Sequence, residues 1–236
     1  MNKHILLVYN MGNSGGKYIE DICNIHEDVQ VWQEANHVLK VDTLDGSLQS
    51  DAVYKFFMEQ YQTSPKKTIG LIKAFDDRLI RFVERFGGSI IQTFRHPIGV
   101  VNFKTGYKMK ECERRGLFDK LDTPEKIFEA HVEFYASVYQ AYTDNIHRWP
   151  VVKLEDMKKS LREKTPYFAE TFAKALKVDW REEHTQKVIA LGVNPELSIK
   201  DDHSHLDIWE SWDKIKKEIF LSYFEDTMKF YNYEWE

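Results

Sequence analysis

The first eighteen residues constrain the fold of this chain more than any other segment. An apolar run, Ile5–Tyr9, breaks into a loop that reads Asn-Met-Gly-Asn-Ser-Gly-Gly-Lys-Tyr over 10–18. A short β-branched and aliphatic run followed at once by glycines predicts a buried strand that enters a tight loop. The residues after the loop suit a helix through apolar groups at Tyr18, Ile19, Ile22, Cys23 and Ile25. Strand, glycine loop and helix aim backbone N–H groups at one point, which favours an anion such as phosphate or sulfate.

The spacing of this loop differs from that of nucleoside-triphosphatases. Their loop needs a glycine, four residues, then Gly-Lys and a Ser or Thr that binds magnesium. Here Gly16-Lys17 is followed by Tyr18, and Met11 stands where the first glycine should be. A magnesium-dependent ATP or GTP site of that kind is therefore disfavoured. The alternative to anion binding is that the glycines only make a strand-to-helix turn.

Length and composition predict one globular domain over 1–236, because 42% of the 236 residues are apolar. The net charge of −5 gives no reason to expect nucleic acid as a partner. The two cysteines, Cys23 and Cys112, lack metal-ligand spacing and are interpreted as reduced thiols. No signal peptide and no apolar run near ~20 residues is visible, so we expect a cytoplasmic protein without a membrane span.

Strand-like and helix-like segments alternate along the chain. The predicted strands are Ile5–Tyr9, Val29–Trp32, Thr68–Lys73, Ser89–Phe94 and Pro150–Leu154. The predicted helices are Asp51–Tyr61, Asp76–Phe86, Pro124–His147, Pro166–Leu176, Trp180–Leu191 and Trp212–Phe230. This order predicts an α/β fold of the P-loop type, with three layers, a central mainly parallel sheet and a helical C-terminal part.

A second candidate anion-binding group follows the fourth predicted strand. Ser89–Phe94 ends in Arg95-His96-Pro97, and the next residues suit a helix that starts at the proline. Ligands of parallel sheets bind at the carboxyl ends of the strands, and the planar guanidinium of Arg95 suits a phosphate. The alternative is an arginine that pairs with a surface carboxylate.

Five segments, in order, resemble sulfotransferases that use 3′-phosphoadenosine 5′-phosphosulfate. The loop over 12–18 resembles the 5′-phosphosulfate loop, and Ser89–Lys104 resembles the 3′-phosphate motif, a strand that ends in Arg-Asp/Asn/His-Pro. Gly70–Lys73 resembles the family's Ile-Lys-Thr-His strand, and Val151–Met157 resembles its Val-Arg-Tyr-Glu-Asp-Leu/Met strand and turn. Trp209–Tyr233 resembles the family's tryptophan-containing segment and last helix.

The resemblance implies roles for individual residues. It implies that the 5′-phosphosulfate is cradled by Gly12, Asn13, Ser14, Gly15, Gly16 and Lys17. Lys17 would be the cation at the leaving phosphate oxygen, and Tyr18 would stack on adenine. Arg95 would hold the 3′-phosphate. The motif has a serine where this chain has Phe103, and Asn102 or Lys104, each able to donate to phosphate, could partly replace it. The product would be 3′,5′-adenosine bisphosphate, and no metal is expected. The alternative for Lys17 is a solvated lysine in the first turn of the helix.

A sulfotransferase also needs a base for its acceptor. Cytosolic members carry a histidine two residues after the strand lysine, but this chain has Phe75 there. Tyrosylprotein and bacterial-type members carry a glutamate after His-Pro-Asp-Val, and His26-Glu27-Asp28-Val29 puts Glu34 in that register. Glu34 is the candidate base, His37 is the reserve, and local capping or pairing by Glu34 is the alternative.

Three departures from the family pattern keep other functions open. Asn13 stands where the family often has a lysine or arginine, and Phe75 and Phe103 replace a histidine and a serine. A P-loop phosphotransferase or a nucleotide-binding protein without catalysis are therefore alternatives. The family's basic Arg-Lys-Gly before the tryptophan is absent; His203-Ser204-His205 stands near there, and its spacing favours a polar loop over a metal site. The acceptor (small molecule, glycan or peptide) and the oligomeric state are left open.

Overall fold

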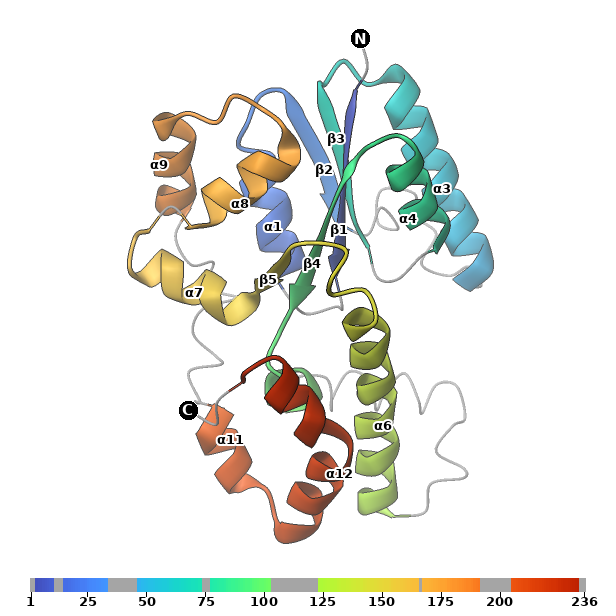
Figure 1. Ribbon diagram of the computed structural model, residues 1–236, viewed down its shortest axis with the longest axis vertical. Coiled ribbons are helices and arrows are strands. Elements are labelled where there is room, and N and C mark those ends of the chain that lie inside the picture. Colours follow the sequence, from blue (N-terminus) through green and yellow to red (C-terminus); the bar gives the residue numbers. More distant parts are fainter. Residues whose placement is uncertain are drawn as a thin grey trace. The chain divides into compact units, whose positions relative to one another are not determined.

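The structure is a computed structural model that describes residues 3–10, 15–33, 46–73, 77–102, 123–165, 167–191 and 205–233 (Figure 1). The chain divides into two compact units. One is made of Met1–Phe94 and His147–Pro195, and the other of Arg95–Ile146 and Glu196–Glu236. The single domain expected over 1–236 stays a prediction.

The first unit holds a parallel five-stranded sheet in the order β2-β3-β1-β4-β5. Its strands are β1 (His4–Asn10), β2 (Val29–Gln33), β3 (Thr68–Lys73), β4 (Ser89–Phe94) and β5 (Val151–Lys153). All five predicted strands are present, because each is a short apolar run that the sheet buries. The α/β prediction with a parallel sheet is confirmed.

Helices cover both faces of this sheet and make three layers (Figure 1). One face carries α3 (Gly46–Thr63) and α4 (Asp77–Arg85). The other carries α1 (Gly16–Cys23) and α8 (Tyr167–Leu176), and the same unit contains α7 (Leu154–Arg162) and α9 (Glu182–Leu191). The buried side of α1 includes Cys23, a free thiol.

The strand order places β1 at the centre of the sheet. From β1 the chain builds β2 and β3 on one side and then β4 and β5 on the other. Ligands of such sheets bind at the carboxyl ends of the strands, where the direction of winding reverses. Close packing of β3 between β1 and β2 requires Gly70 in β3, because a Cβ there would lie 2.9 Å from Val31 Cγ2 and 3.0 Å from the Leu6 carbonyl oxygen.

The second unit is helical in its described part. It contains a helix over 97–102, α6 (Pro124–Thr143), α11 (His205–Ser211) and α12 (Lys214–Phe230). The start of α6 is as predicted, with Thr123 accepting the Lys126 N–H at its N-terminus and Pro124 in the first turn. Helix α12 packs on α6, with the Tyr139 and Phe224 rings in edge contact.

The structure corrects the predicted end of α6. The apolar stripe predicted a helix as far as His147, but α6 ends at Thr143 and turns follow. The side chain of Asn145 donates to the Ala141 carbonyl, which satisfies one of the terminal helix carbonyls and ends the helix locally. Among the described helices, none is both long enough and apolar enough to cross a membrane.

Candidate functional site

The turn from β1 into α1 shows why two of the predicted loop glycines are required. Gly15 precedes α1 with a φ of 77°, in the left-handed region that favours glycine. A Cβ at Gly15 would also lie 2.8 Å from Leu154 Cδ1. The Ile19 N–H donates to the Gly15 carbonyl at 2.9 Å. Because the earlier amides of the first turn have no acceptor within the helix, they are suited to bind an anion.

Two side-chain amides converge on the first residue of this helix. A Cβ at Gly16 would lie 2.7 Å from Asn10 Nδ2 and 3.1 Å from Gln33 Nε2. Asn10 is the last residue of β1 and Gln33 the last residue of β2, so both extend from carboxyl ends of the sheet. Thr93 Oγ1 donates to Asn10 Oδ1 at 3.0 Å, which directs the amide nitrogen of Asn10 away from β4. The spot beside Gly16 is therefore lined by N–H donors.

Asn10 and Gln33 are absent from the predicted site. Each is the first polar residue after a predicted strand, and this position in the sequence could have indicated that they belong to the site. Their convergence on Gly16 depends on the strand order, in which β3 lies between β1 and β2. We call Asn10, Gly16 and Gln33 the amide cluster.

Lys17 points along the exposed surface of α1. Its ammonium lies 2.9 Å from carboxylate oxygens of both Glu20 and Asp21, and its side chain is 62% exposed. The hydrogen bond to Asp21, and then that to Glu20, raises the pKa of Lys17, so the group stays charged. These contacts match the alternative of a solvated lysine in the first turn, and a role toward a ligand stays a prediction.

Tyr18 lies on the opposite, buried side of α1. Its side chain is 3% exposed, and this burial raises the pKa of the phenol. A ring in this position packs in the core, so stacking on adenine would require a different side-chain position and stays a prediction. The predicted residues Gly12, Asn13, Ser14, Glu34 and His37 lie outside the described residues, as do Phe75 and Phe103.

Arg95 belongs to the second unit and follows the last residue of β4 directly. It is 6% exposed, and its backbone carbonyl accepts a hydrogen bond from the Tyr139 hydroxyl. Its guanidinium folds over the helix at 97–102, where a Cβ at Gly99 would lie 2.9 Å from Arg95 Nε. Asn102, the last described residue of that helix, is exposed.

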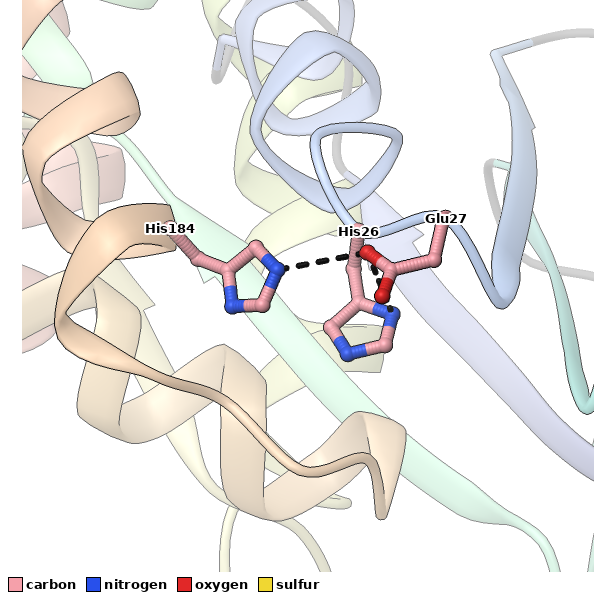
Figure 2. A group of neighbouring side chains, drawn as sticks. All are labelled: His26, Glu27 and His184. Atoms are coloured by element: carbon pink, nitrogen blue, oxygen red, sulfur yellow. Dashed lines mark hydrogen bonds and ion pairs between the residues drawn. The ribbon is translucent and has the colours of Figure 1, made fainter.

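A separate cluster lies at the amino ends of the strands in the first unit. Figure 2 shows His26, Glu27 and His184, whose ligand-type atoms all lie within 4.8 Å of one another. His184 Nε2 is 3.3 Å from Glu27 Oε2, and His26 Nδ1 is 3.9 Å from the same oxygen. Both imidazoles are buried, whereas Glu27 is exposed. These residue types and distances could in principle hold a metal ion.

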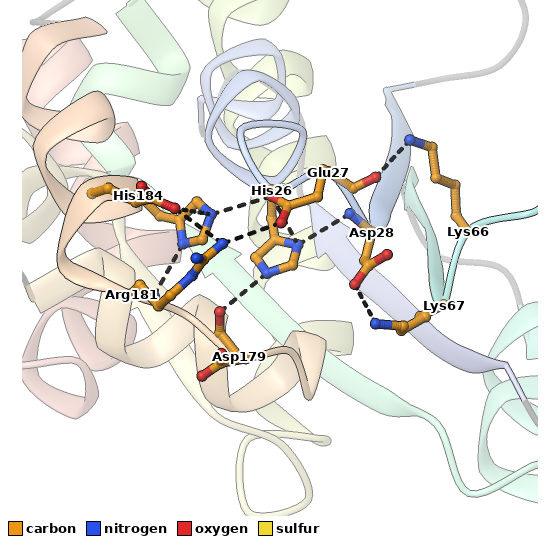
Figure 3. A network of polar contacts seen from close by, with 9 residues as sticks. His26, Glu27, Asp28, Lys66, Lys67, Asp179, Arg181 and His184 are labelled. Carbon is orange, nitrogen blue, oxygen red and sulfur yellow. Dashed lines mark hydrogen bonds and ion pairs between the residues drawn. The ribbon is translucent and has the colours of Figure 1, made fainter.

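Hydrogen bonds explain this cluster without a metal (Figure 3). His184 Nδ1 accepts the Arg181 backbone N–H at 3.0 Å, and His26 Nδ1 accepts the Asp28 N–H at 3.1 Å. Each imidazole then carries its proton on Nε2, which donates to Glu27 in His184 and to the Asp179 carbonyl in His26. A metal at these atoms would have to break those bonds, so we interpret the cluster as a structural junction.

Comparisons with known proteins identify the fold. No family model matches the chain, and no curated protein matches it significantly. A solved structure described as mouse sulfotransferase SULT7A1 complexed with PAP has a TM-score of 0.56 and 13% identity, covering 97% of this chain and 84% of that one. The sulfotransferase domain from the curacin biosynthetic pathway has a TM-score of 0.55 and 12% identity, covering 99% of both chains. The chain has an α/β fold of the P-loop type, and within that class it has the fold of sulfotransferases.

Proposed function

We propose that this protein transfers a sulfuryl group from 3′-phosphoadenosine 5′-phosphosulfate to a hydroxyl or amine of an acceptor. The observation that carries the proposal is the amide cluster at the N-terminus of α1, on the fold of sulfotransferases. The SULT7A1 structure is complexed with PAP, the bisphosphate that remains after such a donor has lost its sulfuryl group.

The amide cluster suits the 5′-phosphosulfate of the donor. The amide nitrogens of Asn10 and Gln33 and the first N–H groups of α1 are fixed donors for its oxygens. Negative charge builds on the phosphate oxygen as the sulfur–oxygen bond breaks, and fixed N–H groups there lower the barrier without reorganising. Gly12, Asn13 and Ser14 would complete the loop around this group.

Arg95 suits the 3′-phosphate of the same donor. Its guanidinium can bind two phosphate oxygens at once, which a lysine cannot do with the same geometry. The Tyr139 hydroxyl and the packing over Gly99 hold the residue in place. We assign Asn102 to the outer side of this phosphate group.

Glu34 is proposed as the base. In the sequence it directly follows Gln33, which is the last residue of β2 and a member of the amide cluster. Its carboxylate would take the proton of the acceptor hydroxyl or amine as the acceptor atom forms a bond to sulfur. The bond between sulfur and the phosphate oxygen breaks in that step, and the bisphosphate leaves.

A second candidate function is donor binding without transfer. The ion pairs of Lys17 with Glu20 and Asp21 favour it, because they hold the predicted cation at the exposed surface of α1. A magnesium-dependent phosphotransferase is disfavoured, because Tyr18 stands where such enzymes need a Ser or Thr.

Transfer of label from ³⁵S-labelled donor tests the proposal. The acceptors would be a phenol, an aliphatic alcohol, an amino sugar and a tyrosine-containing peptide, with a metal chelator present throughout. We expect labelled product with the unmodified protein and at least about a hundredfold less with Glu34→Gln, as removal of a general base typically costs. Bisphosphate binding without transfer to any acceptor would support the second candidate instead.

A further inference from the structure

The side chains of Arg95 and His205 both lie close to the backbone of Gly99 in the second unit. A Cβ at Gly99 would lie 2.9 Å from Arg95 Nε and 3.3 Å from His205 Nε2. The two nitrogens therefore cannot be farther apart than the sum of these distances. Because Gly99 has no side chain, both groups can approach the helix at 97–102 closely. His205 comes from α11, more than a hundred residues later in the chain.

The ring of His205 is held by an aromatic stack. It lies on the ring of His96 with the centroids 3.9 Å apart and the planes at 19°. His96 is 2% exposed, and its Nδ1 accepts the Ile98 backbone N–H at 3.2 Å. Tyr233 also contacts His96, with the ring centroids 4.8 Å apart and the planes at 57°. His205 is therefore presented on a support that is itself fixed by the backbone.

We infer that His205 is a second phosphate-binding group, which acts with Arg95 on the 3′-phosphate of the sulfuryl donor. The inference rests on the proposed function, since it assigns a residue to one phosphate of the proposed donor. A phosphate carries several acceptor oxygens, so an arginine fork and an imidazole N–H can bind it together. His205 would supply positive charge just before Trp209, in a segment that lacks a lysine or arginine between Asp201 and Trp209.

An imidazole makes this binding depend on pH, unlike a second arginine. Among the described residues, the permanent charge of Arg95 and the ring of His96 lie beside His205, and Asp207 follows two residues later on α11. A bound phosphate dianion favours protonation, so the complex binds more protons than the free protein does. Affinity for the 3′-phosphate therefore rises as the pH falls through the range in which histidine titrates.

Titration calorimetry with 3′,5′-adenosine bisphosphate at pH 6.5 and pH 8.0 tests this inference. We expect binding about tenfold weaker at pH 8.0 in the unmodified protein, near the limit for one linked proton over this range. His205→Gln should bind about as weakly at both values, and His205→Lys should bind tightly at both. His147→Gln removes an exposed histidine and is the matched control, with the unmodified pH dependence. Adenosine 5′-phosphate lacks the 3′-phosphate, so its affinity should be the same with and without His205→Gln.

The outcomes separate this inference from the proposed function. Bisphosphate binding with the same pH dependence in His205→Gln as in the unmodified protein overturns the role of His205 and leaves the sulfotransferase proposal standing. An equal loss of adenosine 5′-phosphate binding in His205→Gln also overturns it, because the effect would then not belong to the 3′-phosphate. No bisphosphate binding at either pH overturns the proposed function, and the role of His205 with it.

Discussion

Thr93 of β4 donates a buried hydrogen bond from its hydroxyl to Asn10 Oδ1, at the carboxyl end of the neighbouring strand β1. The oxygen of the Asn10 amide is thereby held toward β4, and its nitrogen faces Gly16. One hydrogen bond inside the sheet thus orients a candidate ligand-binding group at its edge.

Replacing Thr93 by valine should weaken ligand binding, because it removes the hydrogen bond that orients the Asn10 amide. The variant Thr93→Val keeps the shape of the side chain but loses the donor to Asn10, at a cost of about 1 kcal/mol in the free energy of unfolding. We also expect several-fold weaker binding of the bisphosphate, because the Asn10 amide is no longer oriented. Chemical denaturation and calorimetry measure the two effects.

Thr68→Val is the matched control for that experiment. Thr68 is equally buried and donates to the Leu176 carbonyl at 2.8 Å, but it lies at the amino end of β3. It should destabilise the protein by a similar amount and leave bisphosphate binding unchanged. Equal loss of affinity in both variants would mean that stability, and not the orientation of Asn10, is responsible.

A methyl group at Gly16 should block the amide cluster. Its Cβ would meet Asn10 Nδ2 at 2.7 Å, and the bond from Thr93 prevents that amide from turning freely. We expect Gly16→Ala to weaken bisphosphate binding at least about tenfold, which corresponds to the loss of about 1.4 kcal/mol of binding free energy. Gly87→Ala is a suitable control, because that glycine has a φ of 65° but no atom within 4 Å of its Cβ position. It should cost about 1–2 kcal/mol of stability and leave the affinity unaltered. An unchanged affinity in Gly16→Ala would argue against the cluster as a ligand site.

If the His26, Glu27 and His184 cluster is a structural junction, replacing His184 should change stability, and zinc should have no effect on it. His184 is the third residue of α9, and its side chain accepts the backbone N–H of Arg181, the residue before the helix. In the usual capping box, the side chain of a Glu or Gln at this position accepts that N–H. We expect His184→Gln to retain much of the stability and His184→Phe to lose about 1–3 kcal/mol more, because the Arg181 N–H loses its acceptor. Zinc should not raise the melting temperature of the unmodified protein. A zinc-dependent increase that His184→Gln abolishes would show instead that the cluster binds metal.

Burial of His4 predicts how stability depends on pH. Desolvation lowers the pKa of His4 in the folded protein, although its hydrogen bond to the Ala175 carbonyl acts in the opposite direction. The unfolded chain therefore takes up a proton on this residue at a higher pH than the folded protein does. Its contribution to stability is present above the ordinary histidine pKa of about 6.5 and is lost as the pH falls toward the lower folded value. We expect His4→Gln to flatten the loss of unfolding free energy between pH 7 and pH 5, measured by denaturation at each pH. The same slope in His4→Gln and in the unmodified protein would contradict this assignment.

The sheet could be predicted from the sequence because its strands are short apolar runs between polar turns. Thr68–Lys73 and Ser89–Phe94 were predicted with their observed bounds, since each is buried along most of its length. The end of α6 was missed because the apolar stripe continues past Thr143, whereas the Asn145 side chain ends the helix by a local hydrogen bond.

The candidate site could be predicted only where its residues are close in sequence. The roles of Gly15 and Gly16 in the turn follow from the strand–loop–helix pattern. The ion pairs of Lys17 could also have been predicted, since Glu20 and Asp21 stand three and four residues later. The approach of Gln33 to Gly16, and of His205 to Arg95, depends on tertiary packing between distant segments, and no local pattern encodes it.

Binding of 3′,5′-adenosine bisphosphate in the presence of a metal chelator tests the central claim most directly. Calorimetry should show binding to the unmodified protein without metal, and about 10- to 100-fold weaker binding to Arg95→Ala, the usual loss for hydrogen bonds to a charged group. Arg148→Ala, which removes an exposed arginine paired with Glu84, should bind as the unmodified protein does. Absence of bisphosphate binding, or ATP binding that requires magnesium in a parallel titration without chelator, would contradict the proposal that this chain is a sulfotransferase.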